Sequence, residues 1–139
     1  MQDAGRLAAE FEAIDKYWSP RVVAMANGQY VKIAKVMGDF VWHSHAEEDE
    51  FFLVYRGTFI LRYRDGSRTI LEPGDFHVVP RGVEHFPSAP EEAWIIFVEP
   101  AQTRHTGDAE TERTRSIEEQ TAHLRREPSA PEDEMSVGL

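Results

Sequence analysis

The sequence contains no cysteine. Disulfide bonds, thiolate nucleophiles and iron–sulfur clusters are therefore excluded, because each of them needs cysteine sulfur. Any metal ion must be bound through nitrogen and oxygen atoms, so histidine, aspartate and glutamate are the residue types that could form a metal site.

Basic residues are also scarce, with 15 Lys and Arg against 25 Asp and Glu and a formal net charge of −10. Binding to nucleic acid or to an anionic membrane surface depends on Lys and Arg, so this charge argues against both partners. No apolar run approaches the roughly 20 residues that cross a bilayer, and the N-terminus lacks the basic and apolar stretches of a signal peptide. We therefore predict a cytoplasmic protein with no nucleic-acid or membrane partner.

The 139 residues are enough for one domain with one hydrophobic core. Residues 1–20 are predicted to be an N-terminal helical segment, and residues 21–106 are predicted to be a β-barrel. Residues 107–139 hold nine acidic and four basic residues, a net charge of −5, and are predicted to be a polar tail that is partly helical or disordered.

Within the N-terminal segment, apolar residues recur at helical spacing over residues 4–18, and Ser19-Pro20 ends the pattern. This spacing predicts an amphipathic helix that lies on another element. The apolar positions are Leu7, Phe11, Ile14 and Trp18. We expect Phe11 and Trp18 to be packing residues rather than part of a binding site.

The region from residue 21 to residue 100 consists of short β-rich runs separated by turn residues. Eight runs are predicted to be strands: RVVAMA, QYVKIAKVM, FVWHSH, EFFLVYR, TFILRYR, RTILE, DFHVVP and AWIIFVE. Asp65-Gly66, which lies between two of these runs, predicts a tight hairpin. Because no helix separates the strands, the predicted fold is all-β, an antiparallel sandwich or barrel.

Three histidines and one glutamate fall in two short patches of this β-rich region. His43 and His45 are two residues apart, so their imidazoles share one face of a strand, and Glu50 begins the next run after a turn. His85 begins a later strand. Three imidazoles and one carboxylate suit Fe, Mn, Ni, Co, Cu or Zn, and they suit Ca or Mg poorly. The pattern therefore favours one divalent transition metal.

Both patches resemble the two signature motifs of the cupin superfamily. The first motif reads GDFVWHSHAEEDEFFLVYRG over residues 38–57, and the second reads GDFHVVPRGVEH over residues 74–85. The resemblance covers roughly residues 21–100. It implies a single-domain cupin, a double-stranded β-helix or jelly-roll barrel. It also implies that the metal ligands are His43, His45, Glu50 and His85.

This chain departs from the family motifs at two places. The spacing from Gly38 to His43 is one residue shorter than usual, which affects a turn. Ala89 stands where the second motif usually has asparagine, so one polar contact is missing. Neither departure removes a ligand.

The acidic run that ends at Glu50 offers alternative carboxylate ligands. Glu50 is preferred because it opens a strand and because six residues separate it from Gly57, as in the family motif. Asp49 is the alternative. Glu47 and Glu48 are expected to lie in a solvated loop at the mouth of the barrel. The two histidines in or near the tail, His105 and His123, are assigned no role in the site.

Strand alternation predicts which side chains line a pocket beside the metal. The set comprises Val41, Phe52, Val54, Phe59, Leu61 and Tyr63. His77 is either a further donor in this pocket or a partly buried packing residue. Phe40 and Trp42 are expected on the opposite face, where they could pack against another sheet or a second subunit. The predicted lining is largely apolar, which is typical of a small-molecule site.

The resemblance selects no single reaction, because cupins include dioxygenases, isomerases, decarboxylases, lyases and non-catalytic binders. We predict a metalloenzyme that acts on a small organic molecule, with oxygenase chemistry first and isomerase or lyase chemistry next. The alternative is a non-catalytic cupin that binds or senses a small ligand. Because sandwich-type cupins commonly dimerise, the resemblance also implies a homodimer.

Overall fold

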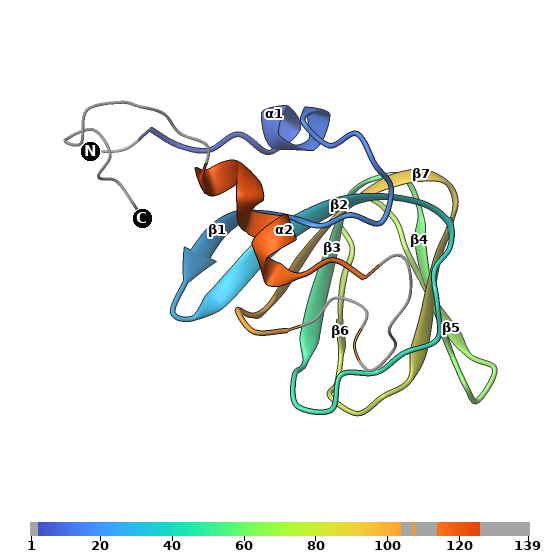
Figure 1. The fold of residues 1–139 in the computed structure, drawn as a ribbon. Coiled ribbons are helices and arrows are strands. Elements are labelled where there is room, and N and C mark those ends of the chain that lie inside the picture. The colour runs from blue at the N-terminus through green and yellow to red at the C-terminus, as the bar shows by residue number, and fades with distance from the viewer. Residues whose placement is uncertain (1–2, 104–106, 108–113, 126–139) are drawn as a thin grey trace.

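The computed structural model describes residues 3–103, 107 and 114–125, and most of this part of the chain is antiparallel β-sheet (Figure 1). The seven strands are β1 (Arg21–Ala26), β2 (Gln29–Asp39), β3 (Glu50–Arg56), β4 (Phe59–Tyr63), β5 (Arg68–Leu71), β6 (Phe76–Val79) and β7 (His85–Pro100). The helical elements are α1 (Leu7–Glu12), α2 (Ile117–Thr121) and the 3-10 helix η1 (Ala122–Arg125). The predicted all-β fold is confirmed.

Strand β7 connects the two halves of the barrel. The strands follow the order β1-β2-β7-β3-β6, and β4 pairs with β5 and with β7. The second half of β7 lies between β2 and β3, whereas its first residues, from His85 to Ser88, pair with β4. All pairings are antiparallel, and the strands wrap around one internal core (Figure 1).

The prediction of eight strands is wrong at residues 40–45, which form no strand apart from an isolated bridge between His43 and His85. Four backbone hydrogen bonds hold this segment: one from Phe40 N–H to Pro87 O, two between His43 and His85, and one from Gly82 N–H to His45 O. The run AWIIFVE, in turn, is the second half of the 16-residue strand β7.

The N-terminal helix is shorter than predicted, because α1 ends at Glu12 and the chain then turns onto the barrel. Trp18 has a φ angle of 59°, its amide N–H donates to Lys35 O, and its indole N–H donates to Met37 O at 2.9 Å. These bonds to β2 fix Trp18 at the edge of the barrel, so the segment that carries it cannot continue the helix.

A second apolar cluster joins α1 to the outer face of the sheet, above β2 and β7 (Figure 1). Phe11 is fully buried there, and its ring stacks on Trp94 with a centroid distance of 4.8 Å and on Tyr55 at 5.3 Å. Burying a phenylalanine side chain stabilises a fold by about 1.5–3 kcal/mol. The N-terminal segment therefore packs as part of the barrel domain.

Close packing against β7 explains why glycine stands at position 57, the end of the first motif. Its φ angle is +84°, and a Cβ atom at this position would lie 2.7 Å from Glu92 O and 2.8 Å from Ala93 Cα. Only glycine allows β3 and β4 to turn this close to β7.

Within the predicted polar tail, helix α2 packs on β1. Ser116 and Glu119 form a capping box at the start of α2, and Gln120 is buried. His123 Nε2 lies 2.8 Å from Val22 O. Residues 104–106, which include His105, and residues 108–113 and 126–139 of the predicted tail lie outside the described residues. In the described part of the chain, no helix is long and apolar enough to cross a membrane.

Candidate metal centre

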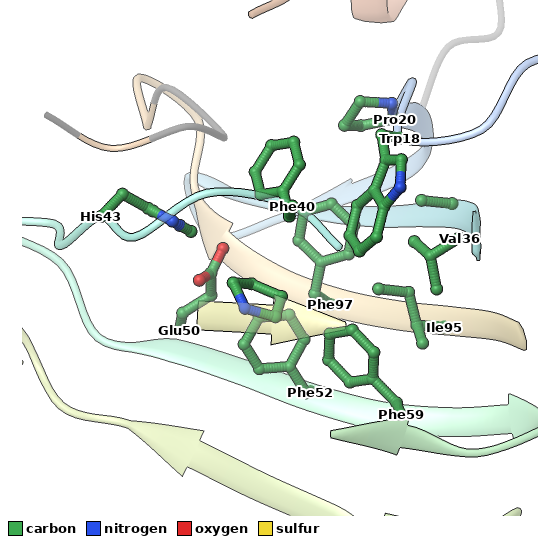
Figure 2. Close-up of a pocket in the computed structure, with 12 residues that line it drawn as sticks. Trp18, Pro20, Val36, Phe40, His43, Glu50, Phe52, Phe59, Ile95 and Phe97 are labelled. Carbon is green, nitrogen blue, oxygen red and sulfur yellow. The ribbon is translucent and has the colours of Figure 1, made fainter. Parts of the chain in front are cut away.

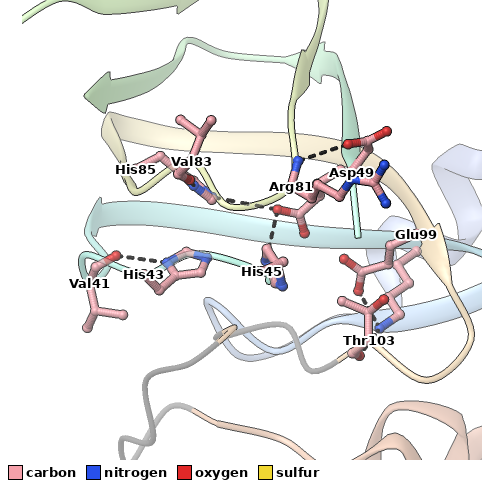
Figure 3. Close-up of polar contacts among 11 residues, drawn as sticks. Val41, His43, His45, Asp49, Arg81, Val83, His85, Glu99 and Thr103 are labelled. Carbon is pink, nitrogen blue, oxygen red and sulfur yellow. Dashed lines mark hydrogen bonds and ion pairs between the residues drawn. The ribbon is translucent and has the colours of Figure 1, made fainter. Parts of the chain in front are cut away.

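The backbone brings His43 and His85 together. Each amide N–H donates to the other residue's carbonyl, at 3.0 Å and 2.9 Å. Each imidazole also places Nδ1 near the carbonyl oxygen two residues earlier, at 3.0 Å from Val41 O and 2.9 Å from Val83 O (Figure 3). Because a carbonyl can only accept, each Nδ1 carries the proton, and each Nε2 is left with a lone pair.

Glu50 and His45 complete a compact cluster with these two rings. Glu50 is the first residue of β3, and its Oε1 lies 3.2 Å from His45 Nε2 and 3.7 Å from His85 Nε2. One potential ligand atom from each of the four residues lies within 4.8 Å of the others, and all four side chains are buried. The structure thus brings together all four residues that the sequence nominated.

Three atoms of this cluster lack hydrogen-bond partners among the described residues. They are His45 Nε2, Glu50 Oε1 and His85 Nε2. An unsatisfied buried polar group costs about 1–3 kcal/mol, so natural proteins rarely leave three of them facing one another. The donor set, two imidazole nitrogens and a carboxylate oxygen beside His43, fits a divalent transition metal.

The family model described as the cupin domain matches residues 30–99, which contain all four of these side chains. The chain belongs to the cupin family. A cupin-2 domain protein from Shewanella frigidimarina NCIMB 400 has a similar structure, with 43% identity, a TM-score of 0.67, and coverage of 68% of this chain and 92% of that one.

Two further proteins are similar to this cupin. The uncharacterized protein YdbB of Bacillus subtilis (strain 168) is 29% identical over 63 residues, which cover 45% of this chain and 56% of that protein. The match thus spans about half the length of this curated relative. The hydroquinone 1,2-dioxygenase of Sphingomonas sp. TTNP3, solved with 4-hydroxybenzoate bound, shares 20% identity, with a TM-score of 0.56 and coverage of 63% of this chain and 68% of that one. At 20% identity, this similarity shows a shared fold and nothing more.

The pKa values of the side chains in the cluster are shifted in different directions. Burial, together with the neighbouring His85, lowers the pKa of His43 to about 4. Burial also pushes the pKa of His45 down, but the contact with Glu50 and its charge outweigh this effect, so the pKa of His45 is raised. Burial would raise the pKa of Glu50, yet its contacts with Glu99, His45 and His85 hold it well below the usual value. A neutral His43 and an ionised Glu50 are the forms that bind a metal cation.

The other acidic residues before Glu50 lie outside the cluster. Asp49 is exposed, and its Oδ1 accepts the backbone N–H of Arg81 at 2.8 Å (Figure 3). Glu47 is exposed and Glu48 is half-buried, as a loop at the barrel mouth would require. Asp49 thus links this loop to the turn before β7.

An apolar cavity of about 40 Å³ opens beside the cluster. Figure 2 shows His43 and Glu50 at one end and a group of apolar side chains, most of them aromatic, in the rest of the view. Its lining consists of Trp18, Pro20, Ala34, Val36, Phe40, His43, Glu50, Phe52, Phe59, Pro87, Ile95 and Phe97.

The predicted lining residues are distributed over several environments. Phe52 and Phe59 line the cavity, whereas Val54 and Leu61 are buried in the core without lining it. Val41 is partly buried against the core. Tyr63 places its hydroxyl 2.7 Å from His77 Nε2, and neither side chain lines this cavity.

The prediction for Phe40 is wrong, because this residue lines the cavity and packs edge-on against His43 at 5.6 Å. Because residues 40–45 are not a regular strand, side chains there do not alternate between two faces. Trp42, in contrast, lies outside this cavity and contacts Phe86 and the guanidinium of Arg64.

Sequence reasoning also missed part of the lining. Trp18 stacks on Phe40 at 4.6 Å and is therefore both a packing residue and a cavity wall. Ile95 and Phe97 could have been found, because they alternate along the last predicted strand in the same way as Phe52. No local pattern pointed to Pro20 or Pro87.

Proposed function

We propose that this cupin binds one divalent transition metal through His43, His45, Glu50 and His85. The observation that carries the proposal is the set of three buried atoms without hydrogen-bond partners that face one another in this cluster. Three imidazoles and one carboxylate favour Fe, Mn, Ni, Co, Cu or Zn over Ca or Mg.

Hydrogen bonds orient the proposed ligands, and aromatic side chains line the space beside them. The hydrogen bonds from Nδ1 to the carbonyls of Val41 and Val83 fix the tautomer and the ring direction of His43 and His85. The aromatic walls exclude water from the space beside them. When bound, the ion would supply Lewis-acid chemistry or, with iron, oxygen chemistry. We infer a metalloenzyme, with oxygenase activity favoured and isomerase or lyase activity next.

The cavity favours a short, largely apolar ligand with an anionic oxygen. Three of the residues that line it, Trp18, His43 and Glu50, have polar side-chain atoms. The indole N–H of Trp18 already donates to Met37 O, so His43 and Glu50 are left to contact a ligand. A sugar would leave several hydroxyls unpaired at about 1–3 kcal/mol each. The cavity is small, at about 40 Å³, so we expect short-chain keto or hydroxy acids to fit it better than phenols.

One observation favours a non-catalytic role instead. Among the cavity-lining residues, His43 and Glu50 are the only side chains that could transfer a proton, and both are proposed to be occupied as ligands. A binding or sensing cupin would need no other group. Oxygen consumption by the iron-loaded protein with a panel of small acids and phenols separates an oxygenase from a binding cupin, because only the oxygenase consumes O₂.

The ligand class can be tested by calorimetric titration of the metal-loaded protein. We expect short 2-oxo and 2-hydroxy acids to bind, phenols to bind more weakly, and free hexoses to give no signal. The metal-free protein is the control and should bind none of them. Tight binding of hexoses, with no response to the acids or phenols, would contradict this description of the pocket.

Metal affinity should fall on acidification as His45 takes up a proton. The pKa of His45 in the metal-free site is raised above 6.5 and that of His43 is lowered to about 4, so protons compete first at His45. Below the raised pKa of His45, we expect the affinity to fall by about tenfold for each pH unit. Cobalt(II) titrations between about pH 8 and pH 5.5 check this slope. An affinity that stays constant over this range would contradict it.

A homodimer and a cytoplasmic location remain predictions. The outward side of β6 supports the first, since Phe76 is 68% exposed and Val78 is 46% exposed. Apolar surface of this kind is common where a second protein surface packs.

A further inference from the structure

Trp18 is held in a strained backbone conformation. Its φ angle of 59° lies in the left-handed region, which bulky side chains rarely adopt and which glycine or asparagine occupies at lower cost. In the described part of the chain, the other non-glycine residue with a positive φ angle is Asn27, a residue type that tolerates it. Strain at a bulky residue persists only where the surroundings hold it, and such residues concentrate at functional sites. The local turn alone therefore does not explain a tryptophan at position 18.

Two hydrogen bonds to one strand hold Trp18 in this conformation. Its backbone N–H donates to Lys35 O and its indole N–H donates to Met37 O, both at 2.9 Å. Because both acceptors belong to β2, the main chain and the indole ring are fixed together relative to the barrel. Trp18 is a rigid part of the barrel edge, although it lies in a segment without regular secondary structure.

The fixed indole closes the cavity on the side away from the candidate metal ligands. Phe40 packs edge-on against His43 at 5.6 Å and stacks on Trp18 at 4.6 Å. Figure 2 shows this row, with Trp18 on the far side of Phe40 from His43. Because the indole covers one face of Phe40, the Phe40 ring cannot move in that direction unless Trp18 moves as well. Trp18 thus limits the length of the cavity both directly and through Phe40.

This wall comes from outside the part of the chain that the cupin family model matches. The matched part is residues 30–99, and Trp18 and Pro20, which both line the cavity, precede it. All the other residues that line the cavity lie within the matched part. The segment before β1 therefore adds a boundary that the matched domain does not supply itself.

We propose that Trp18 is a specificity-determining residue, whose indole excludes 2-oxo and 2-hydroxy acids with long or aromatic side chains. A fixed wall selects ligands by clashing with those that are too long. The inference rests on the proposed function, since these acids are the ligand class proposed for the cavity. Replacing a large buried side chain with alanine can leave an apolar cavity of roughly 150 Å³, which accepts a benzene ring. Trp18→Ala is therefore expected to admit an acid that carries a phenyl group.

The test measures the binding of pyruvate and phenylpyruvate to the cobalt(II)-loaded full-length protein by calorimetry. The quantity compared is the ratio of the two dissociation constants, and we expect the parent to favour pyruvate. In Trp18→Ala, the ratio should shift toward phenylpyruvate by at least about tenfold, because the clash with the phenyl group is gone. The affinity for pyruvate itself should stay within about threefold of the parent, since pyruvate does not reach the wall.

Trp94→Ala is the matched control, because Trp94 is as deeply buried as Trp18, and each is 6% exposed. Trp94 also stacks on a phenylalanine, with a centroid distance of 4.8 Å to Phe11, and its indole N–H donates to Glu92 Oε2 at 2.8 Å. It lies in the outer apolar cluster and does not line the cavity. Its replacement should leave the ratio as in the parent. Equal shifts in the two variants would reflect a general loosening of the barrel and would overturn the proposal.

An unchanged ratio in folded Trp18→Ala would also overturn it. If either alanine variant does not fold, Trp18→Phe and Trp94→Phe replace the pair: the smaller ring at position 18 must shift the ratio toward phenylpyruvate, and equal ratios in the two variants overturn the proposal. A parent chain that binds no cobalt would instead overturn the proposed metal site, and a loaded parent that binds neither acid would overturn the proposed ligand class. Both results differ from a parent that binds the acids with a ratio that Trp18 does not control.

Discussion

Replacing His85 with alanine is expected to lower the affinity for a transition metal by more than about 100-fold, because loss of a ligand exceeds the 10- to 100-fold loss typical of its outer partners. His85, the last residue of the second motif, is 0% exposed and forms a bridge with His43 of the first motif. The same replacement at His43 or His45 should have a similar effect. Cobalt or manganese titration of each purified variant measures it.

His77→Ala is the matched control for these variants. His77 is partly buried on the neighbouring strand β6, but it contacts Tyr63 and does not belong to the four-residue cluster. Its replacement should leave the metal affinity within about threefold of the parent, since it removes no ligand and no ligand partner. Equal losses in His77→Ala and His85→Ala would mean that the effect is not specific to the proposed ligands.

Phe11→Ala should destabilise the protein by about 3–5 kcal/mol, the range for removing a fully buried phenylalanine. Phe11 is 0% exposed between Trp94 and Tyr55, so its removal would leave a cavity under α1. Denaturant unfolding of the metal-free protein measures the change. Phe76, which is 68% exposed, provides the control, and Phe76→Ala should change the free energy of unfolding by about 0.5 kcal/mol or less. A loss below about 1 kcal/mol for Phe11→Ala would show that α1 is only loosely attached.

The four candidate ligands could be nominated from the sequence because their positions follow from short-range rules. His43 and His45 are two residues apart, Glu50 opens a strand, and His85 begins another strand. What the sequence could not provide is the mutual placement of these segments. That placement depends on the reciprocal hydrogen bonds between His43 and His85, which join residues 42 positions apart in the chain.

The lining of the cavity was only partly predictable, because alternation applies to regular strands alone. It worked for Phe52 on β3 and Phe59 on β4, which both line the cavity. It failed for Phe40, whose segment is held by individual hydrogen bonds rather than by a ladder. The apolar spacing predicts a helix that includes Trp18, whereas the bonds of Trp18 to Lys35 O and Met37 O fix it at the cavity wall.

Lys32 and Glu99 are both 0% exposed, with Lys32 Nζ 2.7 Å from Glu99 Oε2, and no sequence signal pointed to this contact. Lysine and glutamate on strands are usually solvent-exposed, so a pattern-based interpretation assigns both to the surface. Only the pairing of β7 with both β2 and β3 reveals that the two residues share the inner face with Glu50. The long-range order of the strands therefore decides which buried charges lie near the candidate metal ligands.

The metal content of the full-length protein, purified without a metal-affinity tag, tests the central claim most directly. Elemental analysis should find one transition metal ion per chain in the parent and none in the double variant His43→Ala/His45→Ala, because two of the four ligands are gone. Circular dichroism of both proteins should be the same, since neither histidine belongs to a strand. Full metal occupancy in the folded double variant would place the metal elsewhere and contradict the account.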